Sequence, residues 1–253
     1  MIEKITKAVK ACAKIMLEAE TIDDGVMVKE GHANFVTYYD KRVQDALFGA
    51  LKRDFPEAVF AGEEQEEMTD ISKGMAFIID PIDGTSNFIK GYNCSCISVG
   101  VVMDGERYAG VIYDPYREEC FTAERGKGAF LNGEPIHVSQ TPLKYSLVGF
   151  GTSPYHEELF PHTFDLAMKY CKRSIDVRRS GSAALDLCTL ACGRTGFFFE
   201  LNQKPWDFSA GIVIIEEAGG IVMTEEGKKV PLMEPSSVFA MNPVIYEEEF
   251  AGI

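Results

Sequence analysis

The alternation of helical and strand-like segments is the feature that most restricts the fold of this 253-residue chain. Helix signals, either apolar side chains every three or four residues or a cap followed by a glycine stop, fall at 2–19, 37–55, 156–173, 181–193 and 207–220. Short apolar runs that predict strands fall at 58–62, 75–80, 195–200, 221–225 and 237–242. A strand-rich stretch at 94–138 contains two hairpin signals, Asp104-Gly105 and Asn132-Gly133. This order predicts a layered mixed α/β fold.

The character of the chain changes near residue 140, where the strand-rich stretch gives way to helices. We therefore expect an N-terminal α+β part at 1–140 and a C-terminal α/β part at 141–253. The sequence contains no repeat, low-complexity segment or long linker between them. The two parts are expected to form one compact unit.

Charge and hydropathy argue against several classes of function. The net charge of −14 argues against sequence-independent nucleic-acid binding, which needs a basic surface. No apolar run approaches the roughly 18 residues of a membrane span, and the start of the chain is amphipathic, unlike a signal peptide. With no CxxC pair among the cysteines, we expect reduced thiols and a cytoplasmic protein without nucleic-acid or membrane partners. Cys94 and Cys96, and Cys188 and Cys192, are expected to pack in the core.

Acidic residues stand at the ends of several apolar segments. Glu63, Asp80, Asp83 and Glu200 each follow a predicted strand, and Asp207 opens a predicted helix. Strand ends are where α/β sheets place their ligands. If these carboxylates converge, each like-charged pair costs about 4 kcal/mol at about 4 Å and an effective dielectric near 20, so cations would be needed to neutralise them. Carboxylate ligands indicate Mg²⁺, with Mn²⁺ as a substitute.

The segment Asp-Pro-Ile-Asp-Gly-Thr at 80–85 combines a stiff turn with phosphate donors. Pro81 restricts the backbone, and the three-residue offset can bring both aspartates to one side, with the Ile82 carbonyl directed into the same space. The N–H groups of Gly84 and Thr85 suit a phosphate. The combination indicates metal-assisted phosphoester hydrolysis. For this segment alone the alternative is an ordinary turn with a helix cap.

Four motifs resemble those of the inositol monophosphatase family. They are GEE at 62–64, DPIDGTSNF at 80–88, GSAALDL at 181–187 and PWDFSAG…EEAGG at 205–220. The resemblance extends over nearly the whole chain. It implies the five-layer αβαβα sandwich that this family shares with fructose-1,6-bisphosphatases. It also implies a homodimer, two or three bound Mg²⁺ ions and inhibition by Li⁺.

The resemblance implies metal ligands among the matched residues. A first Mg²⁺ would be held by Glu63, Asp80 and the carbonyl of Ile82. A second would be held by Asp80, Asp83 and Asp207. Glu63 would also help to keep a third ion.

The resemblance implies catalytic and substrate-binding roles as well. The implied catalytic residues are Glu63, Thr85 and Asp40, with Thr85 hydrogen-bonded to Asp40 so that the pair orients and deprotonates the attacking water. The implied substrate contacts are Asp83, Gly84, Thr85, Ala183, Glu200 and Asp207. Lys29 matches a lysine that the family carries near the site, and Arg178 is expected at a subunit contact. For each of these two, a surface role is the alternative.

Together these features predict an inositol-1(or 4)-monophosphatase-type phosphoric monoester hydrolase. It would use Mg²⁺ and a metal-activated water to release phosphate from inositol monophosphate. Residues 141–176 match the family pattern poorly, and this stretch often shapes the substrate pocket. A fructose-1,6-bisphosphatase, or a broader sugar or nucleotide phosphatase, is therefore the first alternative. A non-catalytic binding or regulatory protein is the second, and the intact set of predicted ligands argues against it.

Overall fold

The computed structural model describes residues 1–19, 26–28, 35–65 and 69–251. Lys29 lies outside these residues, so its expected role stays a prediction. The helices are α1 (Ile2–Leu17), α2 (Tyr38–Asp54), α3 (Thr85–Ile89), α4 (Phe160–Cys171), α5 (Ala183–Ala191), α6 (Pro205–Glu217) and α7 (Pro243–Glu249). The strands are β1 (Val26–Val28), β2 (Phe35–Thr37), β3 (Val59–Gly62), β4 (Met75–Asp83), β5 (Cys96–Met103), β6 (Glu106–Asp114), β7 (Glu119–Glu124), β8 (Ala129–Leu131), β9 (Glu134–Ile136), β10 (Leu147–Phe150), β11 (Asp176–Arg178), β12 (Phe197–Gln203), β13 (Ile221–Met223) and β14 (Ser236–Met241).

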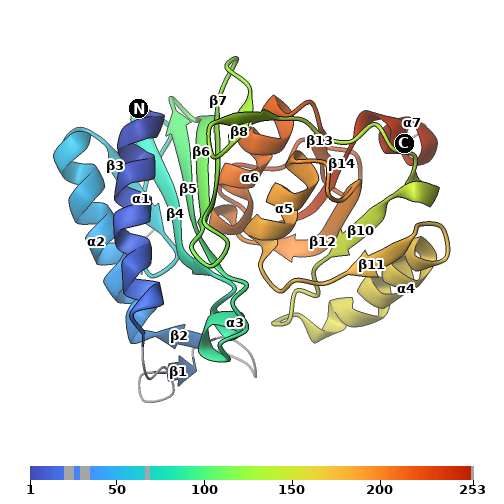
Figure 1. Cartoon of the computed structure of the whole chain (residues 1–253), viewed down its shortest axis with the longest axis horizontal. Coiled ribbons are helices and arrows are strands. Elements are labelled where there is room, and N and C mark those ends of the chain that lie inside the picture. The colour runs from blue at the N-terminus through green and yellow to red at the C-terminus, as the bar shows by residue number, and fades with distance from the viewer. Residues whose placement is uncertain (20–25, 29–34, 66–68, 252–253) are drawn as a thin grey trace.

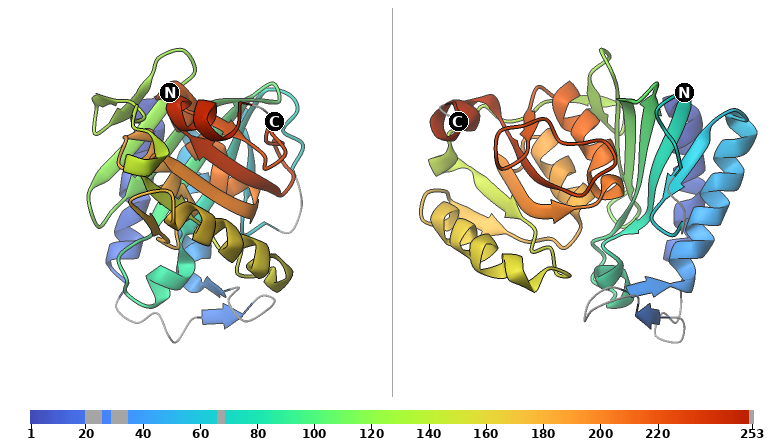
Figure 2. Two further views of the ribbon diagram at one scale, coloured as in Figure 1. Left: turned by 90° about the vertical axis from the view of Figure 1, so that its right-hand side faces the viewer. Right: turned by 180° about the vertical axis from the view of Figure 1, so that it is seen from behind.

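These elements form five layers in the order helix, sheet, helix, sheet, helix (Figures 1 and 2). Helices α1 and α2 cover the outer face of the first sheet. Helices α5 and α6 lie between the two sheets, and α4 and α7 lie on the outer side of the second sheet. The arrangement is the predicted αβαβα sandwich, and it buries both faces of both sheets.

The two sheets lie on either side of residue 140 in the sequence. The first has seven strands in the order β3-β4-β5-β6-β7-β8-β9, in which only β3 and β4 run parallel. The second has five strands in the order β11-β10-β12-β14-β13, and β10 runs parallel to both of its neighbours. The middle helices α5 and α6 follow residue 140 but pack against both sheets, which joins the two parts of the chain.

Several predicted elements have the expected character. The hairpin signals join β5 to β6 and β8 to β9, with positive φ at Asp104, Gly105, Asn132 and Gly133. The helix expected at 156–173 is a short 3₁₀ turn followed by α4. Strands β1, β2, β10 and β11 and helix α7 have no counterpart among the predicted elements.

The end of the fourth strand corrects one expectation. The sequence predicts a strand that ends at Asp80, followed by a turn, whereas β4 continues to Asp83. Pro81 does not end the strand because the ladder with β5 is already irregular between Asp80 and Asp83. A proline without an N–H is tolerated at such an irregularity.

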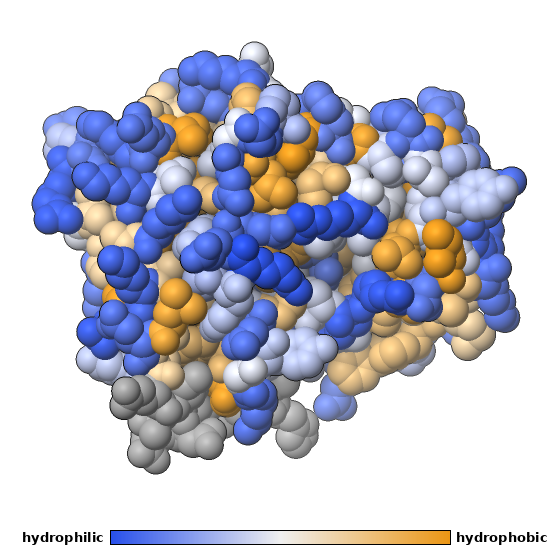
Figure 3. Space-filling view, viewed as in Figure 1, coloured by the Kyte–Doolittle hydropathy of each residue, from blue (hydrophilic) through white to orange (hydrophobic). Residues whose placement is uncertain are grey.

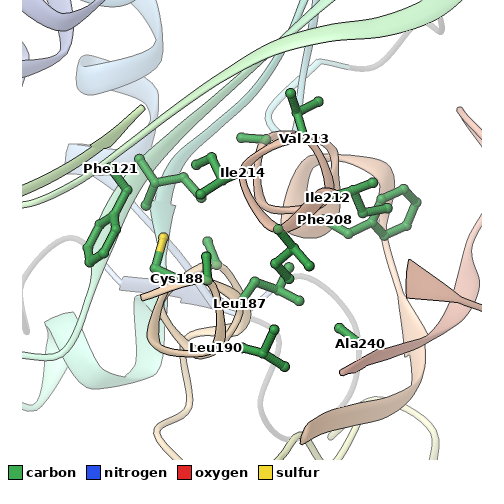
Figure 4. Close-up of a cluster of buried hydrophobic side chains, with 14 of the residues drawn as sticks. Phe121, Leu187, Cys188, Leu190, Phe208, Ile212, Val213, Ile214 and Ala240 are labelled. Carbon is green, nitrogen blue, oxygen red and sulfur yellow. The ribbon is translucent and has the colours of Figure 1, made fainter. Parts of the chain in front are cut away.

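The largest buried cluster lies around α5 and α6 (Figure 4). Leu187 and Leu190 of α5 and Phe208 and Ile212 of α6 all belong to this cluster. Cys94, Cys96 and Cys188 are buried within the same cluster, and Cys192 packs against it. Core packing, as predicted from their spacing, is therefore confirmed for these cysteines.

Helix α6 approaches the first sheet closely at two glycines. A Cβ atom on Gly110 would lie 2.5 Å from the carbonyl oxygen of Ala210, and one on Gly100 would lie 2.9 Å from the Cβ of Ser209. Neither contact can be relieved by moving a flexible side chain. The glycines therefore set how near α6, and with it Asp207, comes to the first sheet.

We expect Gly110→Ala to lower the free energy of unfolding by about 1–3 kcal/mol, because the added methyl overpacks a backbone contact. The matched control is Gly49→Ala in α2, where a Cβ atom would meet nothing within 4 Å. That change should be neutral or stabilising by up to ~1 kcal/mol, since alanine favours helices over glycine. Chemical denaturation of both variants gives the comparison, and equal stability changes would contradict the close-approach argument.

The face of the molecule in Figure 3 is mainly hydrophilic, with hydrophobic side chains in small separate groups. None of the helices formed by the described residues is both long enough and apolar enough to span a membrane.

Candidate active site

A β-bulge brings two aspartates to the same side of the first sheet. Asp80 pairs with Ser98 and Asp83 with Cys96, so three steps along β4 match two steps along β5. In a regular strand, residues three apart point to opposite faces, and the extra residue of a bulge removes that difference. The Asp80 carboxylate accepts the N–H of Ile82 at 3.0 Å, which stabilises the irregular turn. The predicted convergence is thus achieved within the strand.

A third aspartate joins them from the other part of the chain. Asp207 lies in the first turn of α6, where its carboxylate accepts the N–H of Lys204 at 2.7 Å. Ligand oxygens of Asp80, Asp83 and Asp207 all lie within 4.8 Å of one another. Three carboxylates at this spacing, two of them buried, form a set of oxygen donors that could hold a metal ion.

The electrostatics of this cluster also fit a cation. Burial raises the pKa of Asp80 well above its ordinary value, and the charges of Glu63, Asp83, Asp207 and Asp40 raise it further. The pKa of Asp207 is raised in the same way, by its position inside the pocket and then by Asp83 and Glu63. A group of acids that resist ionisation in this way gains stability when a cation neutralises them.

One oxygen of Asp83 is used by the protein itself. Its Oδ2 accepts the hydroxyl of Ser182 and the N–H of Ala184, the latter at 2.9 Å, and the thiol of Cys96 lies 3.7 Å away. Burial raises the pKa of Asp83, and these hydrogen bonds oppose that rise. The carboxylate is therefore oriented by the start of α5.

We expect Ser182→Ala to weaken metal binding about tenfold, the low end of the range for residues that orient a metal ligand. Calorimetric titration with Mg²⁺ measures this without substrate. Ser182→Thr keeps the hydroxyl and should bind as the natural protein does. Because Ser182 also caps α5, the melting temperature of each variant is needed. Unchanged Mg²⁺ affinity in a folded Ser182→Ala protein would refute the orienting role.

Thr85 and Asp40 form a pair at the edge of the cluster. The Thr85 hydroxyl lies 3.2 Å from Oδ1 of Asp40 and 3.0 Å from the carbonyl oxygen of Ile82, as donor to either. Asp40 is buried in the first turn of α2. The Ile82 carbonyl keeps a second lone pair for a cation. A hydroxyl that donates to a buried carboxylate can accept a proton from water, which is the geometry that a water-orienting pair requires.

The backbone between Asp83 and the start of α3 requires a glycine at position 84. Its φ is 84°, and a Cβ atom there would lie 2.9 Å from the carbonyl oxygen of Cys94. The side chain of Asn87 ties the same turn to the second part of the chain, since its Nδ2 donates to the carbonyl oxygen of Ser180 at 2.9 Å and to that of Cys94 at 2.7 Å. The predicted phosphate-binding turn is thus clamped between both parts of the chain.

Glu200 lines the same pocket. Its carboxylate accepts the N–H of Ser153 at 2.8 Å and the amide of Gln203 at 3.0 Å. A Cβ atom on Gly151 would come within 2.0 Å of it, so this wall depends on a glycine. Burial raises the pKa of Glu200.

The structure places most of the predicted site residues around one pocket. The residues that line it include Glu63, Asp80, Ile82, Asp83, Gly84, Thr85, Ala183, Glu200 and Asp207. Asp40 does not line it, but its carboxylate lies 3.2 Å from the hydroxyl of Thr85, which does. Arg178 is exposed and paired with Asp176, away from the pocket. The chemical roles of all these residues stay predictions.

Sequence reasoning missed part of the pocket wall. Ser182, Arg179 and the segment 151–156, which includes Tyr155, all line it. In the sequence, only the glycine, proline and tyrosine of segment 151–156 indicate an irregular backbone there. Ser153 there has φ of 43°, which is uncommon outside glycine.

Comparisons with known proteins agree with this site. The family model "Inositol monophosphatase family" matches residues 1–251. Inositol monophosphatase 1 of Solanum lycopersicum is 37% identical over 227 residues, which cover 87% of this chain and 83% of that protein. Nus factor SuhB of Escherichia coli is 34% identical over 251 residues, which cover 98% and 93%.

Solved structures give the same result. An IMPase of Thermotoga maritima has a TM-score of 0.87 and 31% identity, covering 96% of this chain and 92% of that one. SaIMPase-II bound to inositol monophosphate has a TM-score of 0.82 and 26% identity, covering 98% and 92%. On the family match, the identities and the pocket geometry, the chain belongs to the inositol monophosphatase family.

Proposed function

We propose that the protein is a Mg²⁺-dependent phosphomonoesterase that hydrolyses inositol monophosphate to inositol and phosphate. The observation that carries the proposal is the cluster of Asp80, Asp83 and Asp207, whose ligand oxygens lie within 4.8 Å, beside the hydrogen-bonded pair Thr85 and Asp40. A family membership alone would leave the chemistry open, because one relative is named as an inositol monophosphatase and another as a Nus factor.

The metal ligands in this proposal are Glu63, Asp80, Asp83, Asp207 and the carbonyl of Ile82. Two or three Mg²⁺ ions, when bound, would supply the positive charge that neutralises the carboxylates and the phosphate and that acidifies water. Mn²⁺ is a plausible substitute because it takes the same oxygen ligands. The bulge in β4 and the start of α5 hold the carboxylates in place before any ligand arrives.

The remaining steps belong to residues of the chain. The N–H groups of Gly84 and Thr85 would bind the phosphate, and the Thr85 hydroxyl would pass its own proton to Asp40 as it takes one from the attacking water. Ala183 and Glu200, which also line the pocket, would contact hydroxyls of the alcohol. The carboxylate of Glu200 suits a polyol, whose hydroxyls can donate to it.

We expect phosphate release from inositol 1-phosphate with Mg²⁺, loss of release with EDTA, and inhibition when Li⁺ is added with Mg²⁺. Fructose 1,6-bisphosphate and adenosine 3′,5′-bisphosphate are the comparison substrates, and kcat/KM decides among them. Faster release from either would keep the chemistry and move the protein to a sugar or nucleotide phosphatase. No release from any substrate by folded protein with Mg²⁺ would favour the non-catalytic binding protein. The expected homodimer and cytoplasmic location stay predictions.

A further inference from the structure

The pocket contains a phenol hydroxyl that the proposed function does not use. Among the described residues that line the pocket, Tyr155 alone carries such a group. It lies in the segment 151–156, between β10 and the 3₁₀ turn that precedes α4. Tyr155 is 50% exposed, yet burial is the largest of the causes that raise the pKa of its hydroxyl. The hydroxyl is therefore at the inner end of this half-exposed side chain.

The hydroxyl of Tyr155 is turned toward the carboxylate cluster. After burial, the causes that raise its pKa most are the negative charges of Glu63, Asp207, Asp80 and Asp83. These four are the predicted metal-binding carboxylates. The two other acids that line the pocket, Asp186 and Glu200, are not among the largest causes. Since the effect of a charge falls with distance, the hydroxyl lies nearer to the predicted metal ligands than to the rest of the acidic wall.

Hydrogen bonds of its neighbours fix the position of Tyr155. The N–H of His156 donates to the carbonyl oxygen of Ser153 at 2.9 Å, which closes a turn with Pro154 and Tyr155 at its centre. Ser153 is itself tied to β12, because its N–H donates to Glu200 at 2.8 Å and its hydroxyl oxygen accepts the N–H of Asn202 at 3.0 Å. The backbone that carries the phenol is therefore in place before a ligand binds, which lowers the entropy cost of binding.

We propose that the Tyr155 hydroxyl is a further phosphate-binding group, which donates a hydrogen bond to the phosphate held at the carboxylate cluster. The inference rests on the proposed phosphatase function and adds a side-chain donor to the N–H groups of Gly84 and Thr85. Ionised carboxylates only accept hydrogen bonds, whereas a neutral phenol can donate one. Hydrogen bonds to a charged acceptor such as phosphate are shorter and stronger than neutral ones.

Calorimetric titration with inorganic phosphate in saturating Mg²⁺ tests this contact without turnover. We expect Tyr155→Phe to weaken phosphate binding about 10- to 100-fold, the range for loss of a hydrogen bond to a charged group. Tyr155→Leu, which also removes the ring, should weaken it to the same extent. The affinity for Mg²⁺ without phosphate should change less than about threefold in both variants. Tyr145→Phe is the matched control, because Tyr145 is exposed and does not line the pocket, and it should bind phosphate as the natural protein does.

Three results would overturn the proposal. Phosphate affinity that is unchanged in Tyr155→Phe and reduced only in Tyr155→Leu would mean that the ring packs and the hydroxyl makes no contact. Equal losses of Mg²⁺ and phosphate affinity in Tyr155→Phe would place the hydroxyl on the metal site. A raised KM for inositol 1-phosphate with unchanged phosphate affinity would place it on the alcohol.

A failure of the proposed function gives a different pattern. Trp206, the only tryptophan of the chain, lines the pocket, so its fluorescence can report phosphate binding independently of hydrolysis. If the natural protein binds phosphate but hydrolyses no substrate, a loss of binding in Tyr155→Phe would still support the inference. Hydrolysis by the natural protein with unchanged phosphate affinity in Tyr155→Phe would overturn the inference alone. Absence of phosphate binding by the natural protein in Mg²⁺ would overturn both.

Discussion

Asp80→Asn should reduce kcat by about 10³-fold at saturating Mg²⁺ and, in the same protein, raise the melting temperature of the metal-free form. Asp80 is buried at the centre of the carboxylate cluster. The activity loss follows because the change removes a charged ligand, and a metal contributes several kcal/mol of transition-state stabilisation. The amide keeps the shape of the side chain and its acceptor for the N–H of Ile82.

The stability gain follows from the direction of the pKa shift. Burial and the neighbouring acids raise the pKa of Asp80 above its ordinary value of 3.8. The folded protein therefore holds this proton more tightly than the unfolded chain does. The stability that the protonated Asp80 contributes is fully present below that ordinary value and is lost as the pH rises from it through the raised pKa of the folded state. Asparagine stays neutral, so its advantage in EDTA should be large at pH 8 and should vanish near pH 4.

Calorimetric melting in EDTA at both pH values, together with phosphate release in Mg²⁺, tests both halves of this prediction. A gain of ~2 kcal/mol at pH 8 corresponds to roughly 4–8 °C for a chain of this size. Asp165→Asn, an exposed aspartate of α4, is the matched control and should change neither quantity. Activity near that of the natural protein with normal Mg²⁺ dependence would remove Asp80 from the ligand set. A lower melting temperature of Asp80→Asn at pH 8 would show that the neighbouring acids do not destabilise the charged Asp80 carboxylate.

Local signals in the sequence were enough for much of the fold. Asp104-Gly105 and Asn132-Gly133 specify hairpins because both residues of each turn have positive φ. The spacing of apolar residues predicted α1 and α2, and Asp207 with the Gly219-Gly220 stop predicted α6, to within a few residues of their ends. The acids at the ends of strands predicted where the site would lie, because strand ends meet at one edge of a sheet.

The features that sequence reasoning missed depend on contacts between different segments of the chain. Strand β10 has four residues and pairs in parallel with β11 and β12, so no turn signal marks it. The hydrogen bonds of Asp83 to Ser182 and of Asn87 to Ser180 join residues more than 90 positions apart. The bulge in β4 was not predicted either, because a proline after an apolar run normally indicates the end of a strand.

Asp40→Asn and Thr85→Ala should each lower kcat by about 10²- to 10⁴-fold, the range for loss of a positioned acid–base group. Asp40 does not line the pocket, and its carboxylate lies 3.2 Å from the Thr85 hydroxyl, so we expect its effect on catalysis to pass through Thr85. The affinity for Mg²⁺ should change less than about threefold in both variants, since neither is placed among the metal ligands. Rapid-quench measurement of phosphate release and calorimetric Mg²⁺ titration give the two quantities.

The double variant tests whether Asp40 and Thr85 act as one functional unit. If Asp40 acts only through Thr85, Asp40→Asn combined with Thr85→Ala should lose no more activity than Thr85→Ala alone, because residues that act as a unit are not additive. Thr85→Ser, which keeps the hydroxyl, should retain most of the activity and its dependence on Asp40. Losses that multiply in the double variant would mean that Asp40 and Thr85 contribute separately. In that case the proton of the attacking water would need an acceptor other than this pair.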